Sequence, residues 1–302
     1  MNLIIASRGS QLALWQARWV EARLVERGHQ CHIEIIKTTG DKITDTPLAQ
    51  LGAATGGKGL FTKEIEEAIL DGRADLAVHS LKDLPTELPA GLAIAAIPQR
   101  EDPRDAVIGR RLTELEAGQT VGTSSLRRAA QLRRLRPDLR LESIRGNVDT
   151  RLRKLDEGQY AAIVLASAGL RRLGWTDRIA EILAPETMCP AVGQGALAIE
   201  TRADGPAREV CAALDHAETH AAVASERAFL SALGGGCQLP IGAYARLEGE
   251  ILRLRGLVIA PDGSRCVEGD RTGAAQSAEE LGAALGADLL ARGARALLDA
   301  HE

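Results

Sequence analysis

The chain has 302 residues, of which 45% are hydrophobic and 26% are charged, and its formal net charge is -4. This length and apolar fraction predict a stably folded globular protein with two or three domains. The small negative charge excludes a global basic field for nucleic acid or an anionic membrane, and the 2% aromatic content argues against a base-stacking surface.

The cysteines and the first residues of the chain indicate the compartment. The five cysteines are scattered, odd in number and free of CxxC pairs, which argues against a disulfide framework or a zinc site. Arg8 interrupts the short apolar run at the N-terminus, and no apolar stretch approaches the length of a membrane span. We therefore expect a cytoplasmic protein with no metal, nucleic-acid or membrane partner.

The first part of the chain alternates between two hydrophobic patterns. Strand and helix patterns follow one another in the order strand 3–7, helix 12–28, strand 32–40, helix 61–72, strand 74–80. Such alternation predicts a largely parallel sheet with helices on its faces. A further apolar strand begins at residue 91, and the charged, proline-containing stretch after it predicts a domain boundary near residue 100.

A second alternating set follows, and then the character of the chain changes. The pattern predicts strand 120–125, helix 126–135, strand 139–147, helix 149–158, and strand and helix within 160–174. The segment 191–202 reads as a strand that returns to the first domain. Beyond it we expect a C-terminal α+β region with helix 220–233, adjacent antiparallel strands 242–247, 251–260 and 265–273, and one final helix 277–298.

Polar and cationic residues gather where predicted strands end and helices begin. In open α/β sheets, ligands bind beyond the carboxyl ends of strands, and helix N-termini with hydroxyl and guanidinium groups bind anions there. The residues in such positions are Arg8, Ser10, Gln16, Thr123, Ser124, Ser125, Arg127, Arg128, Arg145, Asn147, Arg151, Ser167, Arg171 and Arg172. Several such loops together imply a polyanionic ligand. The alternative for each single arginine is a solvated helix face.

Asp83 is a candidate catalytic acid because it follows the strand 74–80 directly, next to Lys82. The alternative is that an aspartate before Leu-Pro only begins a turn. His79 is more typical of a packed or hydrogen-bonded strand residue than of a catalyst. His216 and His220 have the spacing of metal ligands, but no third ligand accompanies them, and we predict no metal.

Two glycine-rich segments are ambiguous from their residues alone. The segment 52–59, GAATGGKG, matches most of a phosphate-binding loop, but Gly59 stands where Ser or Thr should bind magnesium, so a P-loop nucleotide enzyme stays a weak alternative. Lys58 in such a loop can equally contact carboxylates. Cys237 follows three glycines that let the backbone approach closely, yet a buried or idle cysteine is the simpler interpretation.

Taken together, several motifs resemble the porphobilinogen deaminase family over nearly the whole chain. They are IASRGSQLALWQA, GGKGLFTKEIE, ADLAVHSLKDLP, GTSSLRR, RGNVDTRL, GQGALAIE and ALGGGCQLPIGAYA, in the family order. The resemblance implies an α/β fold with two periplasmic-binding-protein-like (type II) domains and a smaller C-terminal α+β domain. We expect domain 1 at 1–99 and 191–215, domain 2 at 100–190, and domain 3 at 216–302.

The same resemblance implies a transferase that deaminates porphobilinogen and condenses four molecules head to tail, releasing hydroxymethylbilane for tetrapyrrole and heme biosynthesis. It implies that Asp83 is catalytic, that Cys237 anchors a dipyrromethane primer as a thioether, and that the protein is monomeric. The implied cofactor contacts are Ser80, Lys82, Thr123, Ser125, Arg127, Arg128, Arg145 and Asn147. The implied substrate contacts are Arg8, Ser10, Gln16, Lys58, Phe61, Arg151, Arg172 and Gln194. Ala54 stands where some members have a lysine. The rival from another class is a non-catalytic, periplasmic-binding-protein-like anion-binding protein, because the first two domains have that architecture and fold alone does not establish function.

Overall fold

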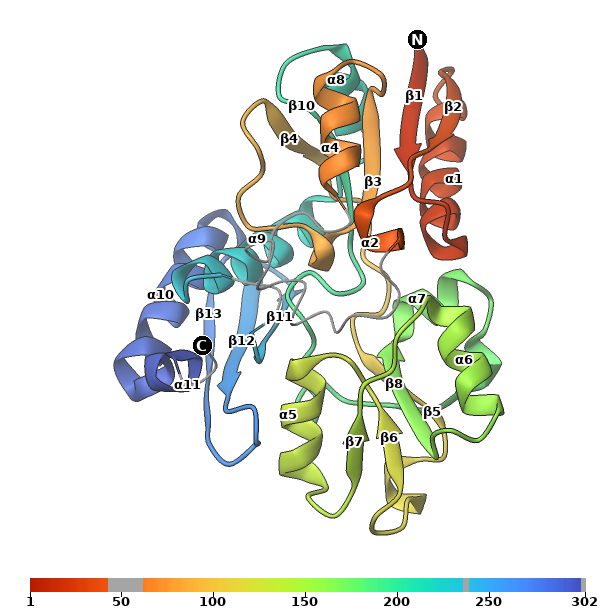
Figure 1. Ribbon diagram of the computed structural model, residues 1–302. Helices are drawn as coiled ribbons and strands as arrows, with labels where there is room; N and C mark the ends of the chain where they lie inside the picture. The colour runs from red at the N-terminus through yellow and green to blue at the C-terminus, as the bar shows by residue number, and fades with distance from the viewer. Residues whose placement is uncertain (43–61, 236–238, 300–302) are drawn as a thin grey trace. The chain divides into compact units, whose positions relative to one another are not determined.

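The computed structural model describes residues 1–42, 62–235 and 239–299 (Figure 1). The chain divides into two compact units, one made of Met1–Glu101 with Ala196–His220 and the other of Asp102–Gly195 with Ala221–Glu302. The described residues contain a five-stranded sheet in the first unit, and a five-stranded and a three-stranded sheet in the second. The three predicted domain ranges stay predictions.

The sheet of the first unit has the strand order β2-β1-β3-β10-β4. β1 runs parallel to β2 and β3, whereas β10 is antiparallel to both β3 and β4. The strands are β1 (Asn2–Ser7), β2 (Gln30–Ile35), β3 (Leu76–Ser80), β4 (Leu92–Ala96) and β10 (Leu197–Arg202). The helices are α1 (Gln11–Val25), α2 (Thr39–Lys42), α4 (Lys63–Leu70), α8 (Pro206–Ala212) and the 3-10 turn η1 (Leu81–Asp83).

Alternation along the strands gives this sheet two apolar faces, each covered by helices. Leu3 and Ile5 of β1 pack in one cluster with Val20 of α1 and with apolar residues of α8. Ala6 points the other way and packs with Ile65 of α4. Successive side chains of a strand point to opposite faces, so β1 is apolar on both. The result is a three-layer α/β/α arrangement.

The five-stranded sheet of the second unit has the strand order β7-β6-β8-β5-β9. β6 runs parallel to β7 and β8, and β5 is antiparallel to β8 and β9. The strands are β5 (Asp105–Gly109), β6 (Thr120–Gly122), β7 (Arg140–Glu142), β8 (Ala162–Ala166) and β9 (Ile179–Ile182). The helices are α5 (Leu126–Leu135), α6 (Val148–Asp156), α7 (Ser167–Arg172), η2 (Leu112–Glu114) and η3 (Thr176–Arg178). Leu132 of α5 packs on one face, and Leu152 of α6 and Leu170 of α7 pack on the other.

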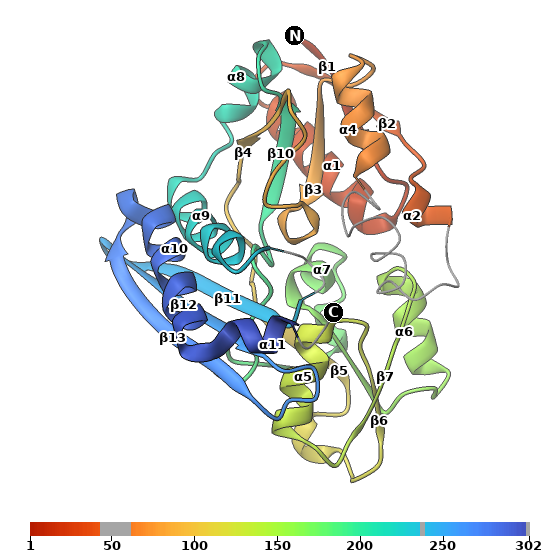
Figure 2. The same cartoon turned by 60° about the vertical axis from the view of Figure 1, so that its left-hand side comes forward.

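The C-terminal sheet is an antiparallel meander of β11 (Ile241–Glu248), β12 (Ile251–Ile259) and β13 (Cys266–Ala274). Its helices are α9 (Ala217–Ala232), η4 (Ala275–Ser277), α10 (Ala278–Leu289), the π-helical segment η5 (Leu290–Ala294) and α11 (Arg295–Asp299) (Figure 2). One face of the sheet packs with these helices around Phe229, and Gly256 is required there because a Cβ would lie 2.6 Å from the Phe229 ring. The other face packs through Leu257 and Ile259 against Ala130 of α5.

The structure bears out most predicted elements and corrects three. β5 and β9 were not predicted as strands, and both pair at the antiparallel side of their sheet. The helix predicted over 277–298 is not continuous, because Gly293 has a φ of 96° and separates α10 from α11. The strand predicted to return to the first domain is β10, which pairs with β3 and β4. Within the described ranges, no helix has both the length and the apolarity needed to cross a bilayer.

Candidate active site

In the first unit, the predicted site residues follow the carboxyl ends of two parallel neighbours, β1 and β3. Arg8 and Ser10 come after β1, and Ser80, Lys82 and Asp83 come at and after the end of β3. Ser10 is the N-cap of α1, where its Oγ accepts a hydrogen bond from the Ala13 N–H at 3.3 Å. Because parallel strands end at the same edge of a sheet, these side chains share that edge.

A buried amide joins helix α1, which follows β1, to the end of β3. Gln16 of α1 is 3% exposed, and its Nε2 donates to Ser80 Oγ at 2.8 Å. After Ser80 the chain forms η1, which is fixed by the Leu81 N–H donating to the Ala196 carbonyl and by the buried Leu81 side chain. Lys82 is half-buried and Asp83 is exposed. The structure therefore presents the Asp83 carboxylate to solvent from an anchored turn.

A buried acidic cluster lies on the same sheet. His79 Nε2 lies 3.0 Å from Glu200 Oε2, which confirms the prediction that His79 is a hydrogen-bonded strand residue. The other oxygen of Glu200 is buried without a hydrogen-bond partner among the described residues, and so is Oε1 of Glu66. Burial raises the pKa of Glu66, and the negative charge of Glu200 adds to this shift.

In the second unit, the predicted residues again follow parallel strands, here β6, β7 and β8. Thr123 and Ser125 follow β6, and Ser125 is the N-cap of α5, accepting a hydrogen bond from the Arg128 N–H at 3.4 Å.

The loops after β7 and β8 carry the other predicted residues. Asn147, after β7, occupies the N-cap position of α6. Nearby, Arg151 Nε donates to the Gly146 carbonyl at 2.8 Å, and Arg145 precedes that glycine, half-buried. In α7, after β8, Arg172 Nη2 donates to the Gly195 carbonyl at 2.6 Å.

Three predicted residues converge on one carboxylate that the sequence did not single out. Asp105, the fully buried first residue of β5, accepts from Arg127 Nη1 at 2.7 Å. It also accepts from Arg128 Nε at 2.9 Å and Nη2 at 2.7 Å. Gln194 Nε2 donates to the same carboxylate at 2.9 Å. We call Asp105, Arg127, Arg128 and Gln194 the Asp105 cluster.

The charges of the Asp105 cluster compensate one another. Burial alone would raise the pKa of Asp105, but the positive charges and hydrogen bonds of Arg127 and Arg128 outweigh it and hold that pKa well below its usual range. Burial lowers the pKa of Arg128, an effect that Asp105 opposes. The carboxylate is therefore ionised at neutral pH and neutralises one of two buried guanidinium groups.

Sequence reasoning missed Asp105 and two further buried residues that support these loops. Gln131 of α5 accepts from the Cys189 N–H at 2.8 Å and donates to the Cys189 carbonyl at 3.1 Å. Glu226 of α9 accepts from the Gly193 N–H, next to Gln194, at 2.7 Å. The one available signal for Asp105 was its place as an acidic residue at the start of an apolar segment. If that segment is a buried strand, the carboxylate is buried with it and needs a cation or a hydrogen-bond donor.

Three predicted site residues, Lys58, Phe61 and Cys237, lie outside the described residues. The histidines with metal-like spacing have protein partners: His216 Nδ1 lies 3.0 Å from Thr219 Oγ1, and His220 Nδ1 lies 2.9 Å from an Asp215 oxygen.

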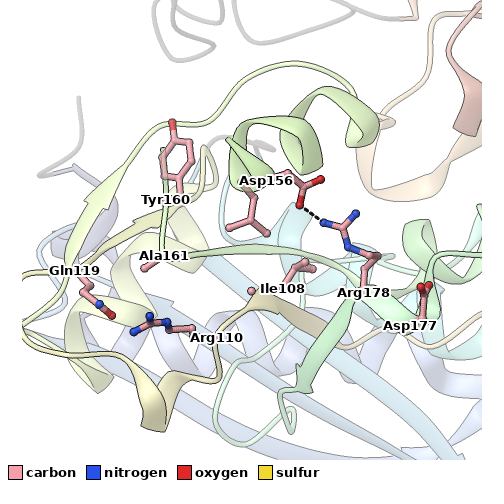
Figure 3. A pocket seen from close by; sticks show the side chains of 10 residues that line it. Ile108, Arg110, Gln119, Asp156, Tyr160, Ala161, Asp177 and Arg178 are labelled. Atoms are coloured by element: carbon pink, nitrogen blue, oxygen red, sulfur yellow. Dashed lines mark hydrogen bonds and ion pairs between the residues drawn. The ribbon is translucent and has the colours of Figure 1, made fainter. Parts of the chain in front are cut away.

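A hollow of about 490 Å³ in the second unit is separate from these residues (Figure 3). Its lining includes Gln119 and Ala161, which precede β6 and β8, and Gly109, which ends the antiparallel β5. It therefore lies at the edge of the sheet opposite the predicted anion loops. Figure 3 shows Asp156 and Arg178, which form an ion pair beside it.

Comparison with known families decides the identity of the chain. Residues 3–209 match the family described as porphobilinogen deaminase, dipyromethane cofactor binding domain, and residues 220–291 match porphobilinogen deaminase, C-terminal domain. The chain belongs to the porphobilinogen deaminase family. Its activity is therefore that of a porphobilinogen deaminase, or hydroxymethylbilane synthase, its substrate is porphobilinogen, and its cofactor is dipyrromethane. With the two α/β sheets and the antiparallel C-terminal sheet, this confirms the predicted fold class and function, and it replaces the anion-binding and P-loop alternatives.

Solved structures of other proteins are similar over part of the chain. The periplasmic VFT2 domain of Bordetella pertussis BvgS is 15% identical with a TM-score of 0.39, and the match covers 70% of this chain and 85% of that domain. A periplasmic substrate-binding protein of an ABC transporter from Coxiella burnetii is 10% identical with a TM-score of 0.43, covering 70% of this chain and 91% of its own. At these values, neither likeness says what the chain does.

Proposed function

We propose that Asp83 is the catalytic carboxylate of this porphobilinogen deaminase. The observation that carries the proposal is an exposed carboxylate on an anchored turn at the carboxyl edge of β3. Asp83 directly follows Lys82, and it comes three residues after Ser80, which accepts a hydrogen bond from Gln16. A carboxylate there can accept hydrogen bonds from pyrrole N–H groups, stabilise the positive charge that develops as ammonia leaves, and assist proton transfer to the departing amine.

We propose that Cys237 anchors the dipyrromethane through a thioether. When bound, this cofactor supplies the pyrrole carbon to which the first substrate ring is joined. Its acetate and propionate groups need cationic and hydroxyl donors, and the described residues fit them: one sheet edge of the second unit carries both kinds, and Arg127 Nε is buried there without a hydrogen-bond partner among the described residues. The proposed cofactor contacts are Ser80, Lys82, Thr123, Ser125, Arg127, Arg128, Arg145 and Asn147.

The remaining predicted residues are proposed to bind the substrate and the growing chain. Each added ring brings two carboxylates, so the charge to be bound rises with every addition, while the protein itself is slightly acidic. Local arginines at strand ends meet this need without a globally basic surface. The proposed contacts are Arg8, Ser10, Gln16, Lys58, Phe61, Arg151, Arg172 and Gln194.

We further propose a cytoplasmic monomer with the three domains given above. The four described cysteines are free thiols, which fits a reducing compartment. The exposed large apolar residues of the described part lie on separate elements, among them Val25 on α1, Ile35 on β2 and Ile251 on β12. Sedimentation of the purified protein tests the monomer.

The role of Asp83 is tested by Asp83→Asn, which keeps the shape of the side chain and removes its charge and its proton. We expect the variant to carry the cofactor by intact mass and to lose about 100-fold or more in kcat, the range for a lost acid–base group. The matched control is Asp71→Asn, an exposed aspartate at the end of α4, which should keep wild-type turnover. Near-normal turnover of Asp83→Asn contradicts the assigned role.

A further inference from the structure

The two guanidinium groups of the Asp105 cluster differ in how many donors the protein itself uses. Arg128 donates from all three nitrogens to protein acceptors: Nε and Nη2 to Asp105, Nη2 also to Gln194 Oε1 at 3.3 Å, and Nη1 to the Val164 carbonyl at 3.2 Å. Its side chain is 7% exposed. Arg128 is therefore held on several sides by the fold.

Arg127 keeps free donor capacity. Its Nη1 donates to Asp105 at 2.7 Å and to the Cys189 carbonyl at 2.5 Å. Its Nε is buried and has no hydrogen-bond partner among the described residues, although the side chain is only 4% exposed. A buried donor without an acceptor is costly, and native proteins keep few of them unless a ligand supplies the acceptor.

Asp105 also determines whether two buried cations can lie side by side. Two neighbouring guanidinium groups repel each other in a poorly solvated site. The carboxylate neutralises one of the two positive charges and fixes the orientation of both side chains through its two oxygens. The two guanidinium groups and the one carboxylate leave a net charge of +1 for an anionic ligand, and the unpaired donor belongs to Arg127.

We propose that Asp105 is a positioning residue for the cofactor, which presents Arg127 to a dipyrromethane carboxylate and keeps Arg128 as its internal support. This inference rests on the proposed function, in which the cofactor is bound at this sheet edge. It refines the proposed contacts for the arginine pair: Arg127 contacts the cofactor directly, and Arg128 contributes to cofactor binding through Asp105. A purely structural ion pair would instead affect folding alone and would treat the two arginines alike.

The test compares Asp105→Asn with Asp102→Asn in the full-length protein. Asp102 lies three residues earlier and also pairs with arginines, with Arg104 at 2.8 Å and Arg171 at 3.4 Å, and it serves as the matched control. Three quantities are measured: the fraction of chains carrying the cofactor by intact mass, the KM for porphobilinogen, and the urea midpoint of unfolding. Mass is recorded before and after incubation with excess porphobilinogen.

We expect folded Asp105→Asn to bind the unattached primer about tenfold or more weakly, which is what a bond to a charged group contributes. The variant should therefore carry the thioether-linked cofactor on a smaller fraction of chains. Excess porphobilinogen should partly restore the loading, because the defect is one of affinity. Asp102→Asn should keep wild-type loading and KM even if its midpoint falls. Wild-type loading and KM in Asp105→Asn, with only a lower midpoint, would overturn the proposal.

A second pair of variants keeps the test decisive if Asp105→Asn does not fold. Arg127→Gln removes two hydrogen bonds but leaves Asp105 bound to Arg128, so its urea midpoint should fall only modestly while its loading falls. Arg128→Gln should lower the midpoint more than Arg127→Gln does. Equal midpoints and equal loading in the two variants contradict the division of roles. If wild type itself carries no added mass, the proposed function fails instead, so the two failures are distinguishable.

Discussion

Glu226 offers the sharpest test of how the C-terminal part supports the site-bearing loop. The side chain is fully buried on α9, and its two oxygens accept from the Gly193 N–H and the Ala245 N–H, both at 2.7 Å. One carboxylate thus joins the turn before Gln194 to strand β11. Glu226→Gln keeps the volume of the side chain and replaces one acceptor oxygen with a donor NH2 group.

The expected cost follows from these two contacts. One backbone N–H keeps an oxygen partner, but the bond becomes a neutral one and loses about half its strength. The other N–H faces a donor, so its bond is lost and a buried group stays unpaired, which costs about 1–3 kcal/mol. Together these effects amount to about 3 kcal/mol in the free energy of unfolding, or about a hundredfold in the folding equilibrium of this part.

Two measurements on Glu226→Gln test this value. Urea unfolding followed by circular dichroism should show a lower midpoint, and hydrogen exchange should show faster exchange of the Gly193 and Ala245 amides. Glu218→Gln, an exposed glutamate in the first turn of the same helix, is the control and should change stability by less than about 1 kcal/mol. An unchanged midpoint with both amides still protected in Glu226→Gln would refute the reasoning.

Two other predictions concern buried titratable groups. Because the folded-state pKa of Glu66 is raised above its ordinary value of 4.5, its contribution to stability is present below that value and lost as pH rises through the folded pKa. Glu66→Gln should therefore melt higher than wild type at pH 8 and equally at pH 4; a lower melting temperature at pH 8 contradicts this. Burial raises the pKa of the Cys189 and Cys211 thiols to about 12. At pH 8 iodoacetamide should alkylate both only after denaturation, and peptide mass spectrometry that finds either alkylated in native protein would disagree.

The sequence predicted the regular elements well where one hydrophobic period persisted. Helix α5 was predicted at its observed bounds, and the strands of the C-terminal meander were found from alternation and the turn at 261–264. β5 and β9 were missed because each has a short apolar run, and β5 follows prolines and charges that are typical of a linker. The break at Gly293 was missed because helical spacing continues through it, and a single glycine in such a pattern is usually tolerated.

The candidate site was predictable in its location and only partly in its chemistry. Parallel strands end at one sheet edge, so residues that follow β6, β7 and β8 had to lie along the same edge. The use of Arg128 as an internal support was not predictable, because its partner Asp105 lies 23 residues earlier with no periodic relation to it. Which donors a protein satisfies itself depends on tertiary contacts that spacing does not encode.

The covalent attachment of the dipyrromethane to Cys237 is the central claim about this enzyme, and the intact mass of the purified protein tests it most directly. The wild-type mass should exceed the chain mass by two linked pyrrole units, and Cys237→Ser should show the chain mass alone. An unmodified wild type that turns over porphobilinogen at full rate, or a Cys237→Ser protein that keeps the added mass, would contradict the claim.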